Sequence, residues 1–240
     1  MEVKVDLGDF ASSLRPNDPR YEVGLSSLVL ALNPFNFQAY LRRGHAYAEL
    51  GEVQKAAEDF RASAALMPAH LRRCSAHFAA VVEDAEALRD YVKALGDLLQ
   101  NLGSNATEAN NLAWQSVTGR EEARDPVKAL ALAERGAALR PGDGIVMNTL
   151  GVVYYRLGWY EQARATLERS LTVNSAKAHD LFFLAMCQAR RGDRDKAREC
   201  YDRAVQWVQQ SEGKLPAGWN EELAVFRAEA AELLGIRQEN

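Results

Sequence analysis

A pair of small residues recurs three times along the chain at the same seven-residue spacing. The pairs are Gly44 and Gly51, Gly151 and Gly158, and Ala185 and Gly192. The interval from Gly151 to Ala185 is 34 residues, and so is the interval from Pro34 to Pro68. A fixed period of this length is typical of helical repeat proteins, whose units bury their apolar faces only by stacking on neighbours. The period therefore predicts an all-α fold.

The residues between these markers predict how each unit is built. In residues 37–70, Tyr40 and Gly44 fall on one face of a helix. Gly51 is expected to end that helix, because glycine adopts the left-handed cap conformation at little cost. A second helix is expected over Val53–Met67, turned back against the first at the small residues.

Related patterns divide most of the chain into units. We expect helix pairs over residues 37–70, 71–109, 110–143, 144–177 and 178–211. A linker or remnant at 1–19 and a partial repeat helix at 20–36 would precede the pairs, and a capping helix at 219–236 would follow them. The 71–109 pair lacks the glycine spacing, so it is where the stacking should deviate most from regularity.

The spacing resembles the tetratricopeptide repeat, with its pattern W-x2-L-G-x2-Y, then A-x3-F, then P. The matches in residues 37–70 are Tyr40, Gly44, Tyr47, Ala56, Phe60 and Pro68. Those in residues 144–177 are Leu150, Gly151, Tyr154, Ala163 and Leu167. The resemblance implies a right-handed α-solenoid of helix-turn-helix repeats that binds other proteins through its concave face.

The second half also resembles the C-terminal repeat regions of large multidomain bacterial proteins of planctomycete type. The similar stretches include Asn110–Trp114, Arg124–Pro126, Asn148–Val152, Asp180–Met186, Tyr201–Val205 and Phe226–Leu234. In those proteins such arrays follow serine/threonine kinase, WD40 or sigma-factor-like regions. The glycine-rich phosphate loop, the H-R-D motif and the D-F-G motif of kinases are absent here. The resemblance therefore implies an accessory module without kinase activity.

Composition narrows the choice of partner and compartment. The chain has 29 Lys and Arg against 33 Asp and Glu, which argues against a nucleic-acid partner held by phosphate neutralisation. It has no run of about 18 apolar residues, so no membrane span is expected. Three cysteines without a CxxC motif fit a reducing compartment, and we expect a cytoplasmic location.

The candidate binding surface is the concave face, which is lined in these repeats by the first helix of each pair. The candidate residues are His45, Glu49, Trp114, Asn148, Val152, Tyr155, Arg156, His179, Phe182, Met186 and Arg190. They would form an apolar groove with a basic rim at Arg156 and Arg190, which suits an extended or helical peptide. The alternative is that the aromatic residues pack against the next repeat.

A second hypothesis concerns metal. His70, Cys74 and His77 lie at spacings of four and three, so one helix face could present all three to zinc. A fourth ligand is not apparent, and ordinary packing of these residues is the favoured alternative.

These patterns together favour a non-enzymatic interaction scaffold that binds a protein or peptide segment and needs no cofactor. A structural arm or dimerisation surface of a larger protein is the alternative within the binding class. The oligomeric state stays open.

Overall fold

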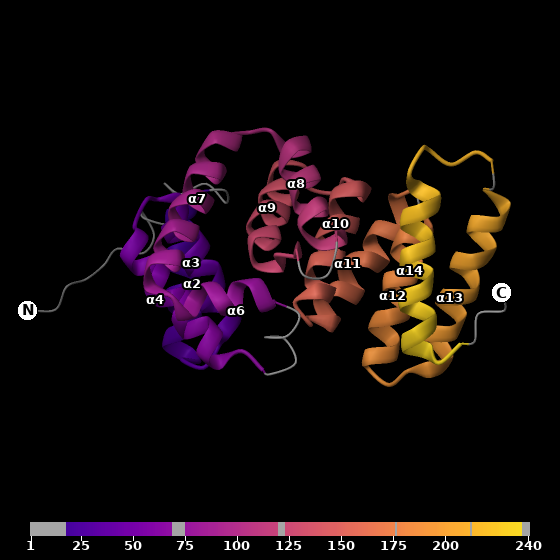
Figure 1. Ribbon diagram of the computed structural model, residues 1–240, viewed down its shortest axis with the longest axis horizontal. Coiled ribbons are helices and arrows are strands. Elements are labelled where there is room, and N and C mark those ends of the chain that lie inside the picture. Colours follow the sequence, from indigo (N-terminus) through magenta and orange to yellow (C-terminus); the bar gives the residue numbers. More distant parts are fainter. Residues whose placement is uncertain (1–17, 69–74, 120–122, 176, 212, 237–240) are drawn as a thin grey trace, which may run out of the picture. The chain divides into compact units, whose positions relative to one another are not determined.

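The computed structural model describes residues 18–68, 75–119, 123–175, 177–211 and 213–236. Within these ranges the chain forms α-helices and no strands (Figure 1). The helices group into two compact units, Met1–Leu139 (unit 1) and Arg140–Asn240 (unit 2). The prediction of an all-α helical repeat fold is confirmed.

Unit 1 begins with a helix that packs against the first complete helix pair. Its helices are α2 (Pro19–Leu32), α3 (Phe37–Glu49), α4 (Val53–Leu66), α6 (Ala76–Glu83), α7 (Ala85–Leu102), α8 (Ala106–Thr118) and α9 (Pro126–Leu139). Asp18, Asn36, Asp84 and Asn105 cap α2, α3, α7 and α8 by accepting backbone N–H hydrogen bonds. These side chains satisfy donors that have no partner inside the helix, which explains where each helix starts.

The α3–α4 pair has the close approach that the small residues predict. A Cβ atom on Gly44 would lie 2.6 Å from the ring of Phe60 on α4, far inside normal contact distance. Phe60 is fully buried and fills the space that the missing side chain leaves. The helix predicted over Val53–Met67 is observed as α4, one residue shorter.

Helix α7 lies in residues 71–109, the segment that lacks the glycine spacing. It packs across α3 as well as α4, while the shorter α6 packs on α4 and α7. The crossing is closest at Gly96, where a Cβ atom would lie 2.2 Å from the carbonyl oxygen of Ala48. The side-chain amide of Gln100 also donates to the Glu49 carbonyl oxygen at 2.7 Å. Helix α7 therefore closes the end of α3.

The α8–α9 pair completes unit 1. Helix α9 starts at Pro126, and the Asp125 carboxylate accepts a hydrogen bond from the Lys128 backbone N–H at 3.0 Å. A carboxylate cap followed by proline at the first helical position is a favourable helix start. Besides packing on α8, α9 contacts α3 and α7. It therefore brings charged side chains to the inner face of α3.

Unit 2 consists of two helix pairs and a final helix. Its helices are α10 (Gly144–Arg156), α11 (Tyr160–Val173), α12 (Lys177–Arg190), α13 (Arg194–Gln210) and α14 (Trp219–Leu234). At Gly151 a Cβ atom would lie 2.5 Å from the Leu167 side chain, which repeats the close approach seen at Gly44. None of the described helices of the chain is long and apolar enough to cross a membrane.

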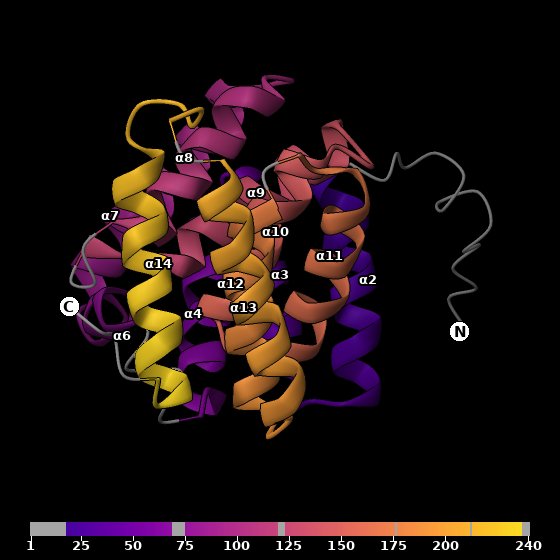
Figure 2. The same cartoon turned by 90° about the vertical axis from the view of Figure 1, so that its right-hand side faces the viewer.

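Helix α14 lies alongside α12 and also contacts α13 (Figures 1 and 2). Leu223, Phe226 and Ala230 are buried on one face of α14. The ring of Trp219 packs edge to face on His179, with 4.8 Å between ring centroids. Trp219 therefore joins the start of the final helix to α12.

Candidate functional site

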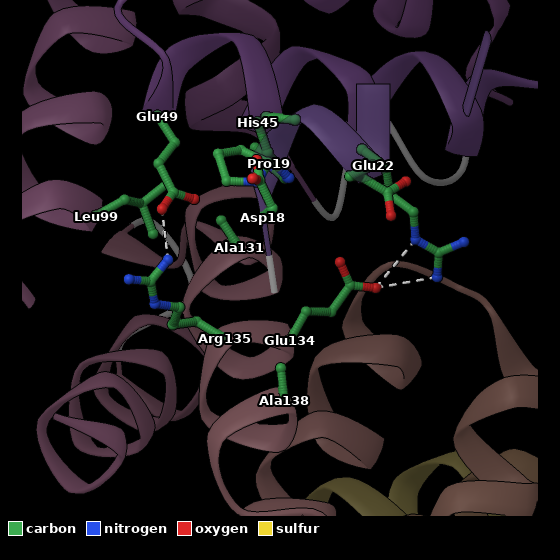
Figure 3. A pocket seen from close by; sticks show the side chains of 12 residues that line it. Asp18, Pro19, Glu22, His45, Glu49, Leu99, Ala131, Glu134, Arg135 and Ala138 are labelled. Carbon is green, nitrogen blue, oxygen red and sulfur yellow. Dashed lines mark hydrogen bonds and ion pairs between the residues drawn. The ribbon is translucent and has the colours of Figure 1, made fainter. Parts of the chain in front are cut away.

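Two of the predicted groove residues, His45 and Glu49, line a cavity on the inner face of α3 (Figure 3). This His45 cavity has a volume of about 120 Å³, and its walls come from α2, α3, α7 and α9. Its charged lining residues are Asp18, Glu22, Arg42, Glu49, Glu134 and Arg135. Four carboxylates face two guanidinium groups, and Arg20, outside the lining, pairs with Asp18, so the cavity with this partner has a net charge of −1.

Ion pairs between α3 and α9 cross the mouth of the cavity. Arg42 on α3 pairs with Glu134 on α9 at 3.0 Å, and Arg135 on α9 pairs with Glu49 on α3. Arg135 also donates to the Gly103 carbonyl oxygen at 2.7 Å, beside the end of α7. The dashed lines in Figure 3 mark the Glu49–Arg135 pair and the contacts of the Glu134 carboxylate. These contacts hold α9 against α3 and leave the cavity between them.

His45 is the most buried ionisable group of the cavity lining. It is 5% exposed, and neither ring nitrogen makes a hydrogen bond of normal geometry. Burial lowers the pKa of His45 to about 3, and the nearby charge of Arg42 acts in the same direction, against the smaller opposing effect of the Val127 backbone on α9. The imidazole is therefore neutral at pH 7 and has one acceptor nitrogen available.

A second hollow adjoins the cavity along α2 and α3. It measures about 340 Å³ and shares Glu22, Arg42 and Glu134 with the His45 cavity. Leu25 and Val29 of α2 add apolar surface to it. The two hollows together offer charged and apolar contacts within unit 1.

Arg42, Glu134 and Arg135 are absent from the predicted groove, because contact between α9 and α3 is a tertiary feature without a local sequence signal.

In unit 2, α14 packs along α12 and reaches the end of α10. The Arg156 guanidinium on α10 makes two hydrogen bonds to the Glu229 carboxylate, one of them at 2.8 Å. The His179 Nε2 atom on α12 lies 3.0 Å from a carboxylate oxygen of Glu222. Phe226 packs between them against His179. Arg156 and His179, two of the predicted groove residues, are therefore already engaged by the final helix.

The aromatic residue of α12 that faces α14 is Phe183 and not the predicted Phe182. Phe183 lies 5.0 Å from Phe226 and 5.4 Å from Tyr155, measured between ring centroids. Phe182 is fully buried and packs against Tyr201 of α13, inside its own repeat. One step along a helix turns a side chain by about 100°, which accounts for this difference. The predicted residues Val152 and Met186 are also fully buried.

Asn148, another predicted groove residue, has a partner within unit 2. Its side-chain amide donates to the Asp180 carboxylate at 2.9 Å, and the Asn174 amide donates to the other oxygen at 3.1 Å. Burial raises the pKa of Asp180 to about 6, against the opposing effect of these hydrogen bonds. This buried network links α10 to α12.

The remaining predicted residues differ in their exposure to solvent. Arg190 is exposed at the end of α12, where its side chain interacts with Tyr155. Tyr155 itself is 7% exposed, and burial raises the pKa of its hydroxyl. Trp114 is half-buried on α8 and belongs to unit 1, whereas Arg190 belongs to unit 2. The predicted set is thus distributed over two units.

Metal ligation is not supported at the described positions. His70 and Cys74 lie outside the described residues, and His77 is exposed next to Tyr91. In the described part of the chain, no group of three His, Cys, Asp or Glu residues is placed to hold a metal ion. Cys187 is buried, and burial raises the pKa of its thiol, which favours a structural role.

Comparison with known proteins points to one repeat family. Residues 37–70 and residues 148–213 each match a tetratricopeptide repeat family model. A search of curated proteins found no match. The crystal structure of yeast Tom70 is similar to 90% of this chain at a TM-score of 0.40 and 16% sequence identity, and the chain covers 44% of the Tom70 chain. The two family matches support the tetratricopeptide repeat family for these segments, and with it a protein-interaction scaffold.

Proposed function

We propose that this chain is a non-enzymatic scaffold that binds a peptide segment on the inner faces of its first helices. The observation that carries this proposal is the His45 cavity, which keeps the inner face of α3 accessible between α2 and α9. Accessible concave surfaces with a few convergent polar groups are typical of ligand sites. No catalytic step is part of the proposal.

The lining of the cavity favours a basic side chain of the peptide. Four carboxylates and two guanidinium groups surround the cavity, and the buried His45 is neutral. A lysine or arginine side chain would reduce the net negative charge and could donate to the unpartnered acceptor nitrogen of His45. Leu25 and Val29 in the adjoining hollow offer contacts for a neighbouring apolar side chain.

The predicted groove residues of unit 2 differ in whether α14 must move before a peptide can contact them. Arg190 is accessible as the structure stands. Tyr155, Arg156 and His179 would contact a peptide only after α14 has moved. Trp114 stays a candidate contact within unit 1.

A peptide library displayed on phage and panned against the full chain tests the cavity. Selected peptides should carry a lysine or arginine and should bind the A138W variant at least tenfold more weakly, because the indole would fill the cavity beside the exposed Ala138. A65W is the matched control, since Ala65 is exposed on α4 and lies outside the cavity lining. Equal binding to the wild type and both variants would remove the cavity as the site.

The exposed apolar residues of α2 favour dimerisation as a second function. Tyr21, Leu25, Leu28 and Leu32 recur at helical spacing and are 37%, 43%, 59% and 89% exposed. Such a stripe is typical of a helix that packs against another chain. Analytical ultracentrifugation of the wild type and an L28E/L32E variant distinguishes the functions. A wild-type monomer at high concentration would count against dimerisation.

We also propose that the chain is part of a larger signalling protein in the cytoplasm. Resemblance of the second half to bacterial multidomain proteins supports an accessory module of a larger signalling protein, and the cysteine pattern supports the cytoplasm. The genomic sequence upstream of Met1 tests the first point, because a fused kinase or propeller would place the repeats in a signalling assembly.

A further inference from the structure

The contacts of α14 define a recognition pattern on unit 2. Trp219, Glu222, Phe226 and Glu229 recur at spacings of three, four and three residues, so they share one helix face. All four meet inner-face residues: Trp219 and Glu222 meet His179, Phe226 meets His179 and Phe183, and Glu229 meets Arg156. The inner face of unit 2 therefore fits an amphipathic helix with a carboxylate on each side of an aromatic ring.

The charged contacts make this pattern specific. The Arg156 side chain is 8% exposed, and a buried guanidinium without a carboxylate partner is strongly unfavourable. Arg156 also lies 5.2 Å from the Phe183 ring centroid, so the carboxylate and the aromatic surface act at one place. A helix that replaces α14 must therefore bring a carboxylate to Arg156 and an apolar ring to Phe183.

The connection to α14 differs from the other junctions of unit 2. Three residues join α10 to α11, α11 to α12 and α12 to α13, whereas eight residues, 211–218, lie between α13 and α14. Gly218 starts α14 with φ +83°, whereas the residues that precede α10, α11 and α13 have negative φ values. A connection of eight residues is long enough to span a displacement of α14 from α12 without disruption of either helix pair.

We propose that the inner face of unit 2 binds a partner protein's amphipathic helix carrying the pattern Glu-x3-Phe-x2-Glu, and that α14 occupies this site until the partner displaces it. This inference rests on the proposed scaffold function and names the partner of its second binding face. Helix α14 would act as an internal competitor that sets the apparent affinity, because only the fraction of molecules with a vacated face can bind.

A fluorescent synthetic peptide of residues 219–236 is a direct probe of the full chain. Wild-type protein should bind it weakly. An E222Q/E229Q variant should bind it at least tenfold more tightly, because its own α14 has lost both charged contacts while the peptide keeps them. The matched control is E221Q/E232Q, which removes the same charge from exposed positions of α14.

Two further measurements keep the outcome unambiguous. A peptide with Phe226 exchanged with Ala228 has the same composition and should bind at least tenfold more weakly. Hydrogen exchange should show that the bound peptide protects α10 and α12 while the chain's own α14 loses protection.

Equal peptide binding by the wild type and E222Q/E229Q would overturn the proposal. The proposal would also be overturned if the E222Q/E229Q variant formed dimers and bound no peptide, because a second copy of the chain would then occupy the inner face of unit 2.

The cavity variant A138W separates this inference from the scaffold proposal. It alters unit 1 and should leave binding of the 219–236 peptide unchanged. If phage-selected peptides ignore the His45 cavity while the 219–236 peptide behaves as expected, the cavity fails as a site and the unit 2 face stands.

Discussion

The inner face of α3 in unit 1 lines an accessible charged cavity, whereas the inner face of α12 in unit 2 lies under α14, which also reaches Arg156 on α10. Both units contain a helix pair with the same small-residue contact, at Gly44 and at Gly151. The difference comes from the helices that pack on each inner face. In unit 1, α7 crosses α3 and α9 contacts it beside the cavity, and in unit 2, α14 packs along α12. The repeat pattern therefore sets the helix pairs, and the helices packed on them decide which inner surface is accessible.

The crossing of α7 over α3 is expected to be the most sensitive position in this comparison. In G96A the new methyl group would meet the Ala48 carbonyl oxygen, which is backbone and cannot rotate away, so unit 1 should lose about 3 kcal/mol of stability. G151A should cost unit 2 less, because the Leu167 side chain can move and alanine favours a helix by about 1 kcal/mol over glycine. Hydrogen exchange in α3 and α10 reports each unit separately.

D97A on the exposed neighbouring position is the control for G96A. If G96A and D97A leave exchange in α3 equally slow, the close approach of α7 to Ala48 is incorrect. If G151A destabilises unit 2 more than G96A destabilises unit 1, the difference between contact with a backbone carbonyl and contact with a movable side chain does not decide the loss of stability.

Acidification should destabilise unit 1 through His45. Its folded pKa of about 3 lies below the unfolded value of about 6.5. Below pH 6.5 the His45 side chain therefore binds a proton in the unfolded chain and stays neutral in the folded chain. Between pH 7 and pH 5 this costs about 2 kcal/mol. The H45L variant should lack that loss, and at pH 7 it should be about 1 kcal/mol more stable than the wild type, because two unpartnered buried nitrogens are removed. Urea unfolding at several pH values measures both effects, and parallel pH profiles of the two proteins would contradict the burial of His45.

Asp180 should give unit 2 the opposite response. Its folded pKa of about 6 lies above the unfolded value of about 3.9, so the folded state holds its proton more tightly. The stability from this group is fully present below pH 4 and is lost as the pH rises through 6, which amounts to about 1 kcal/mol between pH 5 and pH 7.5. The difference in unfolding free energy between the wild type and D180N isolates this contribution. A difference that stays constant from pH 5 to pH 7.5 would show that Asp180 titrates normally.

The sequence predicts the helix pairs because the residues that mark their turns and close contacts are near one another in the chain. Gly151 and the residues around it indicate both the turn and the partner helix without reference to the rest of the chain. The crossing at Gly96 has no such signal, since a glycine inside a helix does not reveal which backbone approaches it. The same limit applies to the groove, where Phe182 and Phe183 are neighbours and only packing against α13 and α14 decides which one faces inward.

The Arg42–Glu134 pair at the mouth of the cavity should show the smallest effect. Its side chains are 32% and 30% exposed, so water and salt screen the charges and a double-mutant cycle should give a coupling of about 0.5 kcal/mol. That coupling should largely disappear in 0.5 M salt. The Arg156–Glu229 pair of unit 2 has a buried guanidinium and should keep more of its coupling in the same salt. Equal salt sensitivity of the two pairs would mean that α14 leaves Arg156 as accessible to solvent as Arg42. The open and covered inner faces would then be equivalent in solution, and the comparison between the two units would no longer hold.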